Sequence, residues 1–234
     1  MLPSGTLRGI AAMLAACAAF ACMDSLLKIL SGTFSPAQVA ALRGLTSLPL
    51  VCLYVAWRGE TRTLFKRKLR WRLHAARGVL TVSMLVLFTY GLRALRVAQA
   101  YTLTFVAPLV ITLLSVPLLG ESVRSRHWIA IAVGFAGVVV ALRPDSGGFL
   151  SLGALAILAA AVCYALSNVL GRLVSPPEPS TTLVFWTTVS LAVGGCLLAA
   201  PTWVPLGREH IGLMVGLAIS GFLGQLAISE AFRH

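Results

Sequence analysis

The sequence predicts an all-α membrane protein, a bundle of helices that crosses a lipid bilayer several times. The first observation is composition: mean hydropathy is +0.90, with 58% hydrophobic and only 11% charged residues. Soluble domains carry about 25% charged residues. The second is that long apolar segments recur along the chain, and the third is that one helix-length segment occurs twice. Continuous apolar segments favour helices over a β-barrel, whose strands would alternate apolar and polar residues.

Eight apolar segments are candidates for membrane spans, because each is close to the roughly 20 residues that cross the hydrocarbon core. The fifth is short and the third has arginines at both ends, so their bounds are the least defined. The eight segments are Gly9–Leu30, Pro36–Trp57, Arg77–Leu95, Ala98–Leu119, Trp128–Leu142, Phe149–Leu170, Thr181–Ala200 and Ile211–Phe232.

The repeat relates Gly9–Lys28 to Gly153–Arg172, which lie 144 residues apart and are identical at seven of twenty positions. The match extends to polar positions, because Asp24 aligns with Asn168. A first unit of five spans (1–145) is odd in number, so the second unit (146–234) enters the membrane from the opposite side. This is the inverted repeat of many secondary transporters. The second unit holds three spans, so we expect a five-plus-five plan that lacks its last two helices.

The charge distribution predicts the orientation. The net charge is +12, and the basic run KRKLRWR at 66–72 raises nucleic-acid binding as an alternative. The run lies between two spans, where a cytoplasmic loop is rich in Lys and Arg. With the N-terminus inside, thirteen of the nineteen Lys and Arg residues fall on the inner side and five on the outer side. We therefore expect a bacterial inner-membrane protein with a cytoplasmic N-terminus and no nucleic-acid partner.

Motifs for catalysis and for cofactors are absent from the sequence. The five cysteines form no CxxC pair, the four histidines form no zinc pattern, and no GxxxxGK[ST] occurs. We therefore predict no enzyme activity, no metal and no cofactor. Leu14–Cys17 resembles a lipoprotein cleavage site, but its helix is copied at Gly153, which favours a retained first span.

Two segments resemble the EamA-type members of the drug/metabolite transporter superfamily, namely Gly91–Glu121 and Trp128–Pro144. The matching residues are Pro108, Gly120, Glu121, Gly134, Gly137, Arg143 and Pro144, and the segments Met23–Lys28 and Leu42–Gly44 are also similar. The resemblance implies a ten-helix carrier of small organic solutes with both termini in the cytoplasm.

The expected function is secondary transport of a small organic metabolite or drug by alternating access. Uptake of vitamins or nucleoside-derived metabolites and export of amino acids both fit the resemblance. A non-transporting or truncated scaffold, or half-carrier, is the alternative that the missing helices keep open, and a membrane enzyme is a weaker one. The partners expected are a small-molecule substrate and the lipid bilayer, and a homodimer is compatible with the sequence.

Polar residues inside spans are the candidate substrate contacts, since a charge there costs about 2.5–3.5 kcal/mol. At 1.5 Å per residue, Asp24 and Arg43 lie about 7 and 5 Å outward of the middle of their spans. We expect them to pair inside the bundle, either to hold substrate or to lock two helices. Lys28 either reaches the outer interface or pairs along its helix. The other candidates are Tyr90, Gln99, Tyr101, Phe105, Asn168, Trp186 and Gln225.

Overall fold

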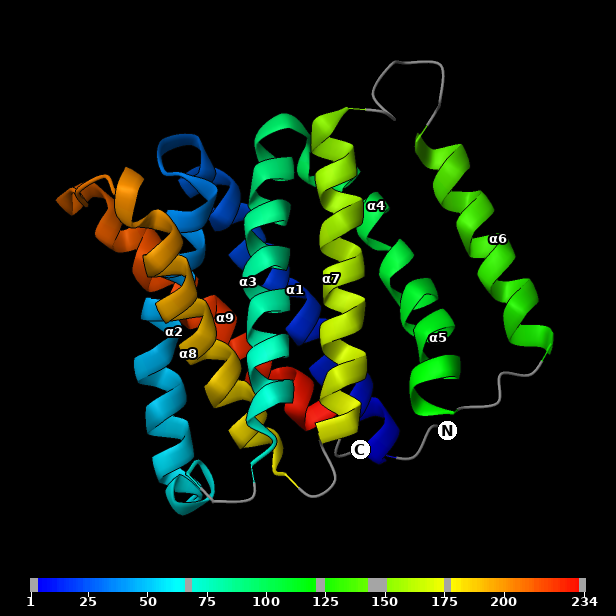
Figure 1. Cartoon of the computed structure of the whole chain (residues 1–234), viewed down its shortest axis with the longest axis horizontal. Coiled ribbons are helices and arrows are strands. Elements are labelled where there is room, and N and C mark those ends of the chain that lie inside the picture. The colour runs from blue at the N-terminus through cyan, green and yellow to red at the C-terminus, as the bar shows by residue number, and fades with distance from the viewer. Residues whose placement is uncertain (1–3, 66–68, 121–124, 143–150, 175–177, 232–234) are drawn as a thin grey trace.

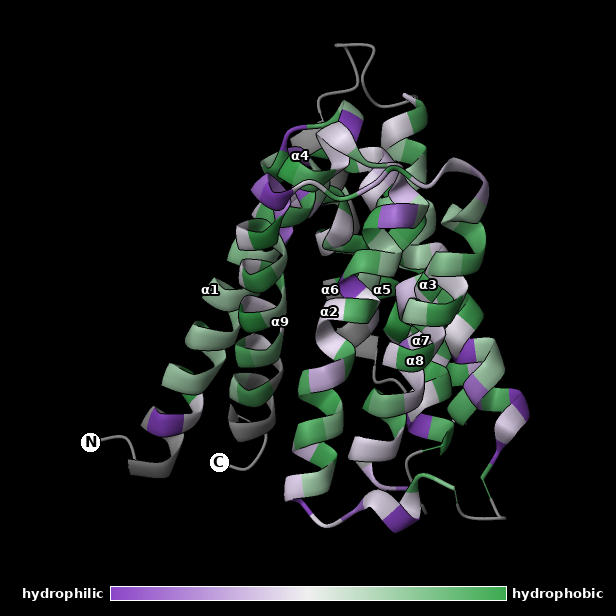
Figure 2. Ribbon diagram, turned by 90° about the vertical axis from the view of Figure 1, so that its left-hand side faces the viewer, coloured by the Kyte–Doolittle hydropathy of each residue, from purple (hydrophilic) through white to green (hydrophobic). Residues whose placement is uncertain are grey.

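The computed structural model describes residues 4–65, 69–120, 125–142, 151–174 and 178–231. Within these residues the chain forms nine α-helices and no strand, which confirms the all-α class. Figure 2 shows ribbons that are mostly hydrophobic along their middle, with hydrophilic residues concentrated toward their ends. The helices are α1 (Ser4–Thr33), α2 (Pro36–Trp57), α3 (Trp71–Ala94), α4 (Val97–Thr104), α5 (Val106–Leu119), α6 (Ser125–Leu142), α7 (Leu152–Val174), α8 (Ser180–Ala199) and α9 (Ile211–Ala231).

Six helical segments among the described residues are long and apolar enough to cross a membrane. They correspond to the first, second, third, fourth, sixth and seventh predicted spans. The fifth and eighth correspond to α6 and α9, in which several side chains lie outside the description. The six segments are Arg8–Thr33, Pro36–Trp57, Trp71–Ala94, Val97–Leu119, Leu152–Val174 and Thr181–Thr202.

The third and fourth spans differ from their predicted bounds. Helix α3 begins at Trp71, six residues before the predicted start at Arg77, because basic residues at the membrane edge continue the helix into water. The fourth span is two helices, α4 and α5, which meet at Phe105. Pro108 explains the break, because its ring lacks an N–H and clashes with the carbonyl four residues earlier, that of Thr104.

Local signals set other helix ends. Helix α2 begins at Pro36, whose fixed φ suits a first helical position, and the Ser35 hydroxyl accepts a hydrogen bond from the Gln38 N–H at 3.2 Å. Helix α5 ends at Gly120, which has a φ of 68° and supplies the left-handed cap that residues with a Cβ adopt poorly.

Helix α1 begins and α9 ends at the same end of the bundle (Figure 1). We call this the first end; it includes the segment 58–65 after α2 and the starts of α3 and α8. The second end contains the end of α1, the end of α3 and the segment 200–210. Helix α6 lies at one edge of the bundle, beyond α5, and packs on α4 and α5 (Figure 1).

The most extensive helix packing joins distant parts of the sequence: α2 with α8, α3 with α7, and α1 with α9. Helices α3 with α8 and α2 with α9 also pack closely. A buried apolar cluster lies between these helices, and its fully enclosed members come from both parts of the chain: Leu27, Leu30, Phe34, Leu42, Leu85, Leu92, Leu103, Ile157 and Leu217.

The crossing of α2 and α8 depends on two glycines. A Cβ on Gly44 would lie 2.3 Å from the backbone nitrogen of Ala192, and a Cβ on Gly195 would lie 2.5 Å from the backbone nitrogen of Ala41. Neither position has room for a side chain. The two helix backbones therefore touch, as they do at small-residue interfaces in membranes.

Candidate functional site

A buried carboxylate lies inside the first span. Asp24 on α1 accepts a hydrogen bond at Oδ2 from the hydroxyl of Tyr101 on α4, at 2.6 Å. Asp24 is buried and Tyr101 is half-buried. On the neighbouring face of α1, Met23 meets Gly221 of α9, where a Cβ would lie 3.3 Å from the methionine sulfur. The hydrogen bond to Asp24 thus comes from α4, within the first part of the chain. The adjacent residue, Met23, contacts α9.

A cation lies at the same level on α2. Arg43 interacts electrostatically with Asp24 and Tyr101, and it is half-buried. It directly precedes Gly44, where α2 touches α8. The ion pairs between described residues are Arg58–Glu60, His74–Glu178 and Glu209–His210, so Asp24 and Arg43 attract each other without direct contact.

Two other basic residues near this level bind helix ends. The Lys28 Nζ on α1 donates to the carbonyls of Leu92 and Leu95 at the end of α3, the second at 2.9 Å. Arg93 on α3 donates in return to Ser31 and Phe34 at the end of α1, at 2.7 and 2.5 Å. Helix C-termini carry unpaired carbonyls and partial negative charge, so each helix supplies a cation for the other's end. Lys28 therefore binds the end of α3, and it pairs neither with a residue of its own helix nor with Asp24.

The first end carries a buried ionisable pair that the sequence did not indicate. Glu178, just before α8, accepts hydrogen bonds from the Arg70 backbone N–H at 3.0 Å and pairs with Nε2 of His74 at 2.7 Å. His74 and Glu178 side chains are 4% and 9% exposed. One turn along α3, the Nε of Arg77 donates to the Ser167 carbonyl on α7 at 3.2 Å. No motif relates residues 104 positions apart, so only the fold reveals the pair.

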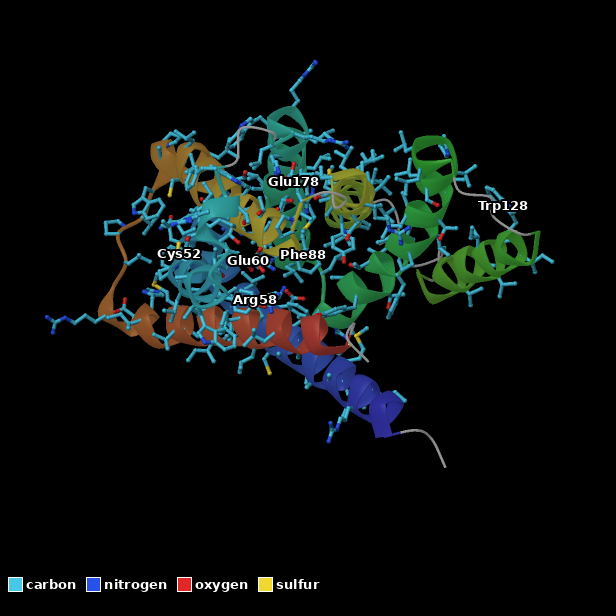
Figure 3. The ribbon with its side chains drawn as sticks, turned by 90° about the horizontal axis from the view of Figure 1, so that it is seen from below. Cys52, Arg58, Glu60, Phe88, Trp128 and Glu178 are labelled. Atoms are coloured by element: carbon cyan, nitrogen blue, oxygen red, sulfur yellow. The ribbon has the colours of Figure 1, made fainter. Side chains whose placement is uncertain are left out.

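Further contacts at this end join the segment 58–65 to α8. The Thr181 hydroxyl binds Glu60, the hydroxyls of Thr63 and Thr182 are 3.3 Å apart, and the Trp186 indole donates to the Leu64 carbonyl at 3.1 Å. Trp186 also packs edge-on against the Trp71 ring, with centroids 4.6 Å apart. Figure 3 shows Glu60 and Glu178 from below, at the end of the bundle where these contacts lie.

The second end has a smaller connection between the same two parts. The Gln38 side chain on α2 is fully buried and makes two hydrogen bonds with the Val204 backbone, donating to the carbonyl at 2.6 Å and accepting from the N–H at 3.0 Å. Phe34 packs edge-on against His210, with ring centroids 4.8 Å apart.

The remaining sequence candidates are dispersed. Tyr90 and Phe105 are exposed. The Gln99 side chain accepts from the Arg96 backbone N–H at 3.1 Å, which caps α4, and Asn168 donates to the Tyr164 carbonyl of its own helix at 2.8 Å. The Gln225 side chain lies outside the described residues. Of the nine candidates, the structure brings together Asp24, Arg43 and Tyr101.

The sequence comparisons match this architecture to known proteins. Residues 7–143, more than half of the chain, match the EamA-like transporter family. The chain belongs to this family. The predicted resemblance is confirmed, and the match covers α1 to α6 with the Asp24, Arg43 and Tyr101 cluster.

Several relatives are named as transporters. The chain is 25% identical to an S-adenosylmethionine uptake transporter of Rickettsia prowazekii, over 89% of this chain and 70% of that protein. It is 26% identical to the pseudopaline exporter CntI of Pseudomonas aeruginosa, over 100% of this chain and 80% of the exporter. It is 27% identical to a riboflavin transporter of Vibrio cholerae, over 97% of this chain and 76% of that protein.

A solved crystal structure shares the fold, with a TM-score of 0.63 and 22% identity over 97% of this chain and 84% of the other. With six apolar helices and a family of transporters, the protein is an integral membrane transporter of small molecules and not an enzyme, as the sequence predicted.

Proposed function

We propose that this protein is a secondary transporter that works by alternating access, with two inverted units, 1–145 and 146–234, that move relative to each other. The observation that carries the proposal is the reciprocal packing of the helices. If α1, α2 and α3 are equivalent to α7, α8 and α9, exchange of the units turns α1·α9 packing into α7·α3 packing. The same exchange turns α2·α9 into α8·α3 and leaves α2·α8 unchanged, and all five are among the extensive contacts.

The glycine contacts support the same exchange. Gly44 meets Ala192, and Gly195 meets Ala41. A shift of 151 residues converts the first contact into the second with its partners swapped, as expected for two related helices that cross on a pseudo-twofold axis. Carriers with inverted repeats bind substrate near the interface between the repeats. Arg43 lies beside this crossing.

The proposed substrate site is therefore centred on Asp24, Arg43 and Tyr101. Tyr90, Phe105, Asn168 and Gln225 remain candidates for its lining. The polar groups of Gln99 and Trp186 bind backbone groups elsewhere, so we assign Gln99 to the cap of α4 and Trp186 to the contact between α8 and the segment 58–65.

The first end is the proposed gate that is closed in this conformation. Polar contacts here join residues 60–81 of the first unit to residues 167–182 of the second, with side chains from both units in most of them but not in the Arg77 contact with the Ser167 carbonyl. Passage of a solute through this end requires these contacts to separate. The Gln38–Val204 contact at the second end is made in the same conformation, and it would separate when the second end opens while the first end stays closed.

We place the first end in the cytoplasm of a bacterium, with the protein in the inner membrane. Exposed basic side chains at this end (Arg58, Arg62, Arg70 and Arg72) support the placement by the positive-inside rule. Lys28 and Arg93, at the second end, are bound to helix carbonyls, so they count less against it.

A reversible cross-link tests the proposal. In a background with the five free cysteines replaced by serine, Thr63→Cys and Thr182→Cys place two thiols where hydroxyls are 3.3 Å apart. The purified full chain is reconstituted in liposomes, and flux of S-adenosylmethionine, riboflavin and pseudopaline is measured. We expect flux of at least one probe when reduced, loss on oxidation, and recovery with reductant.

The single variants, Thr63→Cys and Thr182→Cys alone, are the matched controls, because neither forms the bridge and both should transport after oxidation. Full flux through the cross-linked protein would contradict the gate. No flux of any probe by the reduced protein would contradict transport by this chain and favour a non-transporting scaffold.

A further inference from the structure

The acid and the base at the proposed site are separated, and each has an unused side. Tyr101 occupies Oδ2 of Asp24, and no described residue donates a hydrogen bond to Oδ1. The Arg43 guanidinium makes no hydrogen bond to a described residue. Asp24 is 9% exposed and Arg43 is half-buried, so each keeps some open surface.

Such an arrangement is costly without a further partner. An ionised group inside a membrane span is expensive, and partners in direct contact with good hydrogen bonds are what offset the loss of water. Elsewhere in this protein the cations have such contacts: Lys28 and Arg93 bind helix carbonyls. Asp24 and Arg43 instead attract each other across a gap.

We propose that the substrate is a zwitterion that bridges this gap, with its cationic group on Asp24 and its anionic group on Arg43. This inference rests on the proposed function, since it identifies the substrate class of the same site. One acid and one base leave the site with no net charge. A ligand with a single charge leaves one of the two protein groups without a counter-charge, whereas a zwitterion satisfies both.

The nearby residues support a neutral site. Tyr101 is a donor to Asp24 and brings no charge of its own. His74 and Glu178, the other buried ionisable pair among the described residues, are paired with each other at the first end. The site therefore selects by the arrangement of two opposite charges.

Matched ligands separate the contribution of each charge. Binding to the purified full chain in detergent is measured by thermal shift and calorimetry, which require no transport. The probes are histidine, phenylalanine and S-adenosylmethionine, which has an amino-acid group and a further sulfonium charge, each beside the amine that lacks its carboxylate: histamine, phenethylamine and decarboxylated S-adenosylmethionine. Riboflavin is the uncharged probe. We expect at least one zwitterion to bind, and its decarboxylated partner to bind about tenfold more weakly or worse.

Variants then assign the two charges. Arg43→Gln should abolish the preference for the zwitterion over its decarboxylated partner, and Asp24→Asn should weaken both ligands by about tenfold or more. Tyr101→Phe, which removes one hydrogen bond, should have a smaller effect. Glu209→Gln is the control, because Glu209 is exposed at the second end and should leave binding unchanged.

Binding of riboflavin alone, or of none of these probes, would overturn the proposal. So would an Arg43→Gln protein that melts cooperatively and keeps the preference for the zwitterion. Because binding is measured without flux, a chain that binds zwitterions but does not transport them would contradict only the transport function.

Discussion

The two ends of the bundle join the halves of the protein, which are the proposed units 1–145 and 146–234, in different ways. At the first end, a buried His74–Glu178 hydrogen bond and several hydroxyl, guanidinium and indole contacts connect the α2–α3 region to α7 and α8. At the second end, the charged side chains Lys28 and Arg93 connect α1 to α3, within the first half. Only Gln38 bridges the halves there by a side-chain hydrogen bond among the described residues. The halves are thus tied strongly at one end and weakly at the other.

This difference teaches how one helical scaffold can favour one conformation. The crossing of α2 and α8 at Gly44 and Gly195 lies between the two ends. There is no space between the two helix backbones for a side chain at either glycine. In the proposed transport cycle, movement about this crossing opens one end as it closes the other. Polar contacts are present at both ends in this structure, so the end with fewer contacts between the units costs less free energy to open.

The largest expected effect is at Glu178. Glu178→Ala leaves both the buried His74 and the Arg70 N–H without an acceptor, and each buried group left unsatisfied costs about 1–3 kcal/mol. We expect a clear fall in the melting temperature of the full chain in detergent. Glu209→Ala is the control, because the Glu209 side chain is 73% exposed and its loss should change the melting temperature little. Equal effects would remove the distinction between the ends.

The crossing itself is the next most sensitive position. Gly44→Ala places a Cβ on the backbone of α8, and overpacking of this kind costs about 1–3 kcal/mol. The thermal melting temperature should fall, and cross-linking at both ends should change. Gly212→Ala is matched to it, because no atom lies within 4 Å of the added Cβ. A Gly44→Ala protein as stable as Gly212→Ala would contradict the close crossing.

Loss of the Gln38–Val204 contact at the second end should destabilise the protein less than loss of Glu178. Gln38→Leu removes two hydrogen bonds to the Val204 backbone, but Val204 is 44% exposed and its backbone groups can regain water. We expect a loss of about 1 kcal/mol in stability. Thermal melting beside Glu178→Ala measures the difference, and the comparison fails if Gln38→Leu is the more damaging of the two.

The smallest expected effect is at the reciprocal cations. Lys28→Met and Arg93→Met each remove a cation from a helix end, worth about 0.3–1 kcal/mol. Since both contacts lie within the first half, the rate of Thr63–Thr182 cross-linking should stay unchanged. A marked change in that rate would show that these residues also tie the halves together.

The sequence predicted the general architecture because hydropathy and span length are local properties. It predicted the helices, the family resemblance and the polar positions Asp24, Arg43 and Tyr101. It predicted the fourth span as one segment that Pro108 could bend, whereas two helices, α4 and α5, meet at Phe105. It did not relate His74 to Glu178, or Gln38 to Val204, because these contacts join loops and helix starts that no periodic pattern links.

The roles of Lys28, Gln99 and Trp186 could not be read from the sequence for a different reason. The same polar side chain near a helix end can bind a ligand, lie at the membrane interface or bind an unpaired backbone group. In this fold all three bind backbone groups. Which of these uses applies depends on the position of the neighbouring helix end, which is a property of the tertiary structure.

Cross-linking rates at both ends test alternating access most directly. In the cysteine-free background, one protein carries Thr63→Cys with Thr182→Cys at the first end, and a second carries Gln38→Cys with Val204→Cys at the second end. Both rates are measured with and without S-adenosylmethionine. We predict opposite changes, with one end cross-linking more slowly as the other cross-links faster. Rates that rise or fall together, or that remain fixed while the ligand binds, would contradict movement of the two halves about the central crossing.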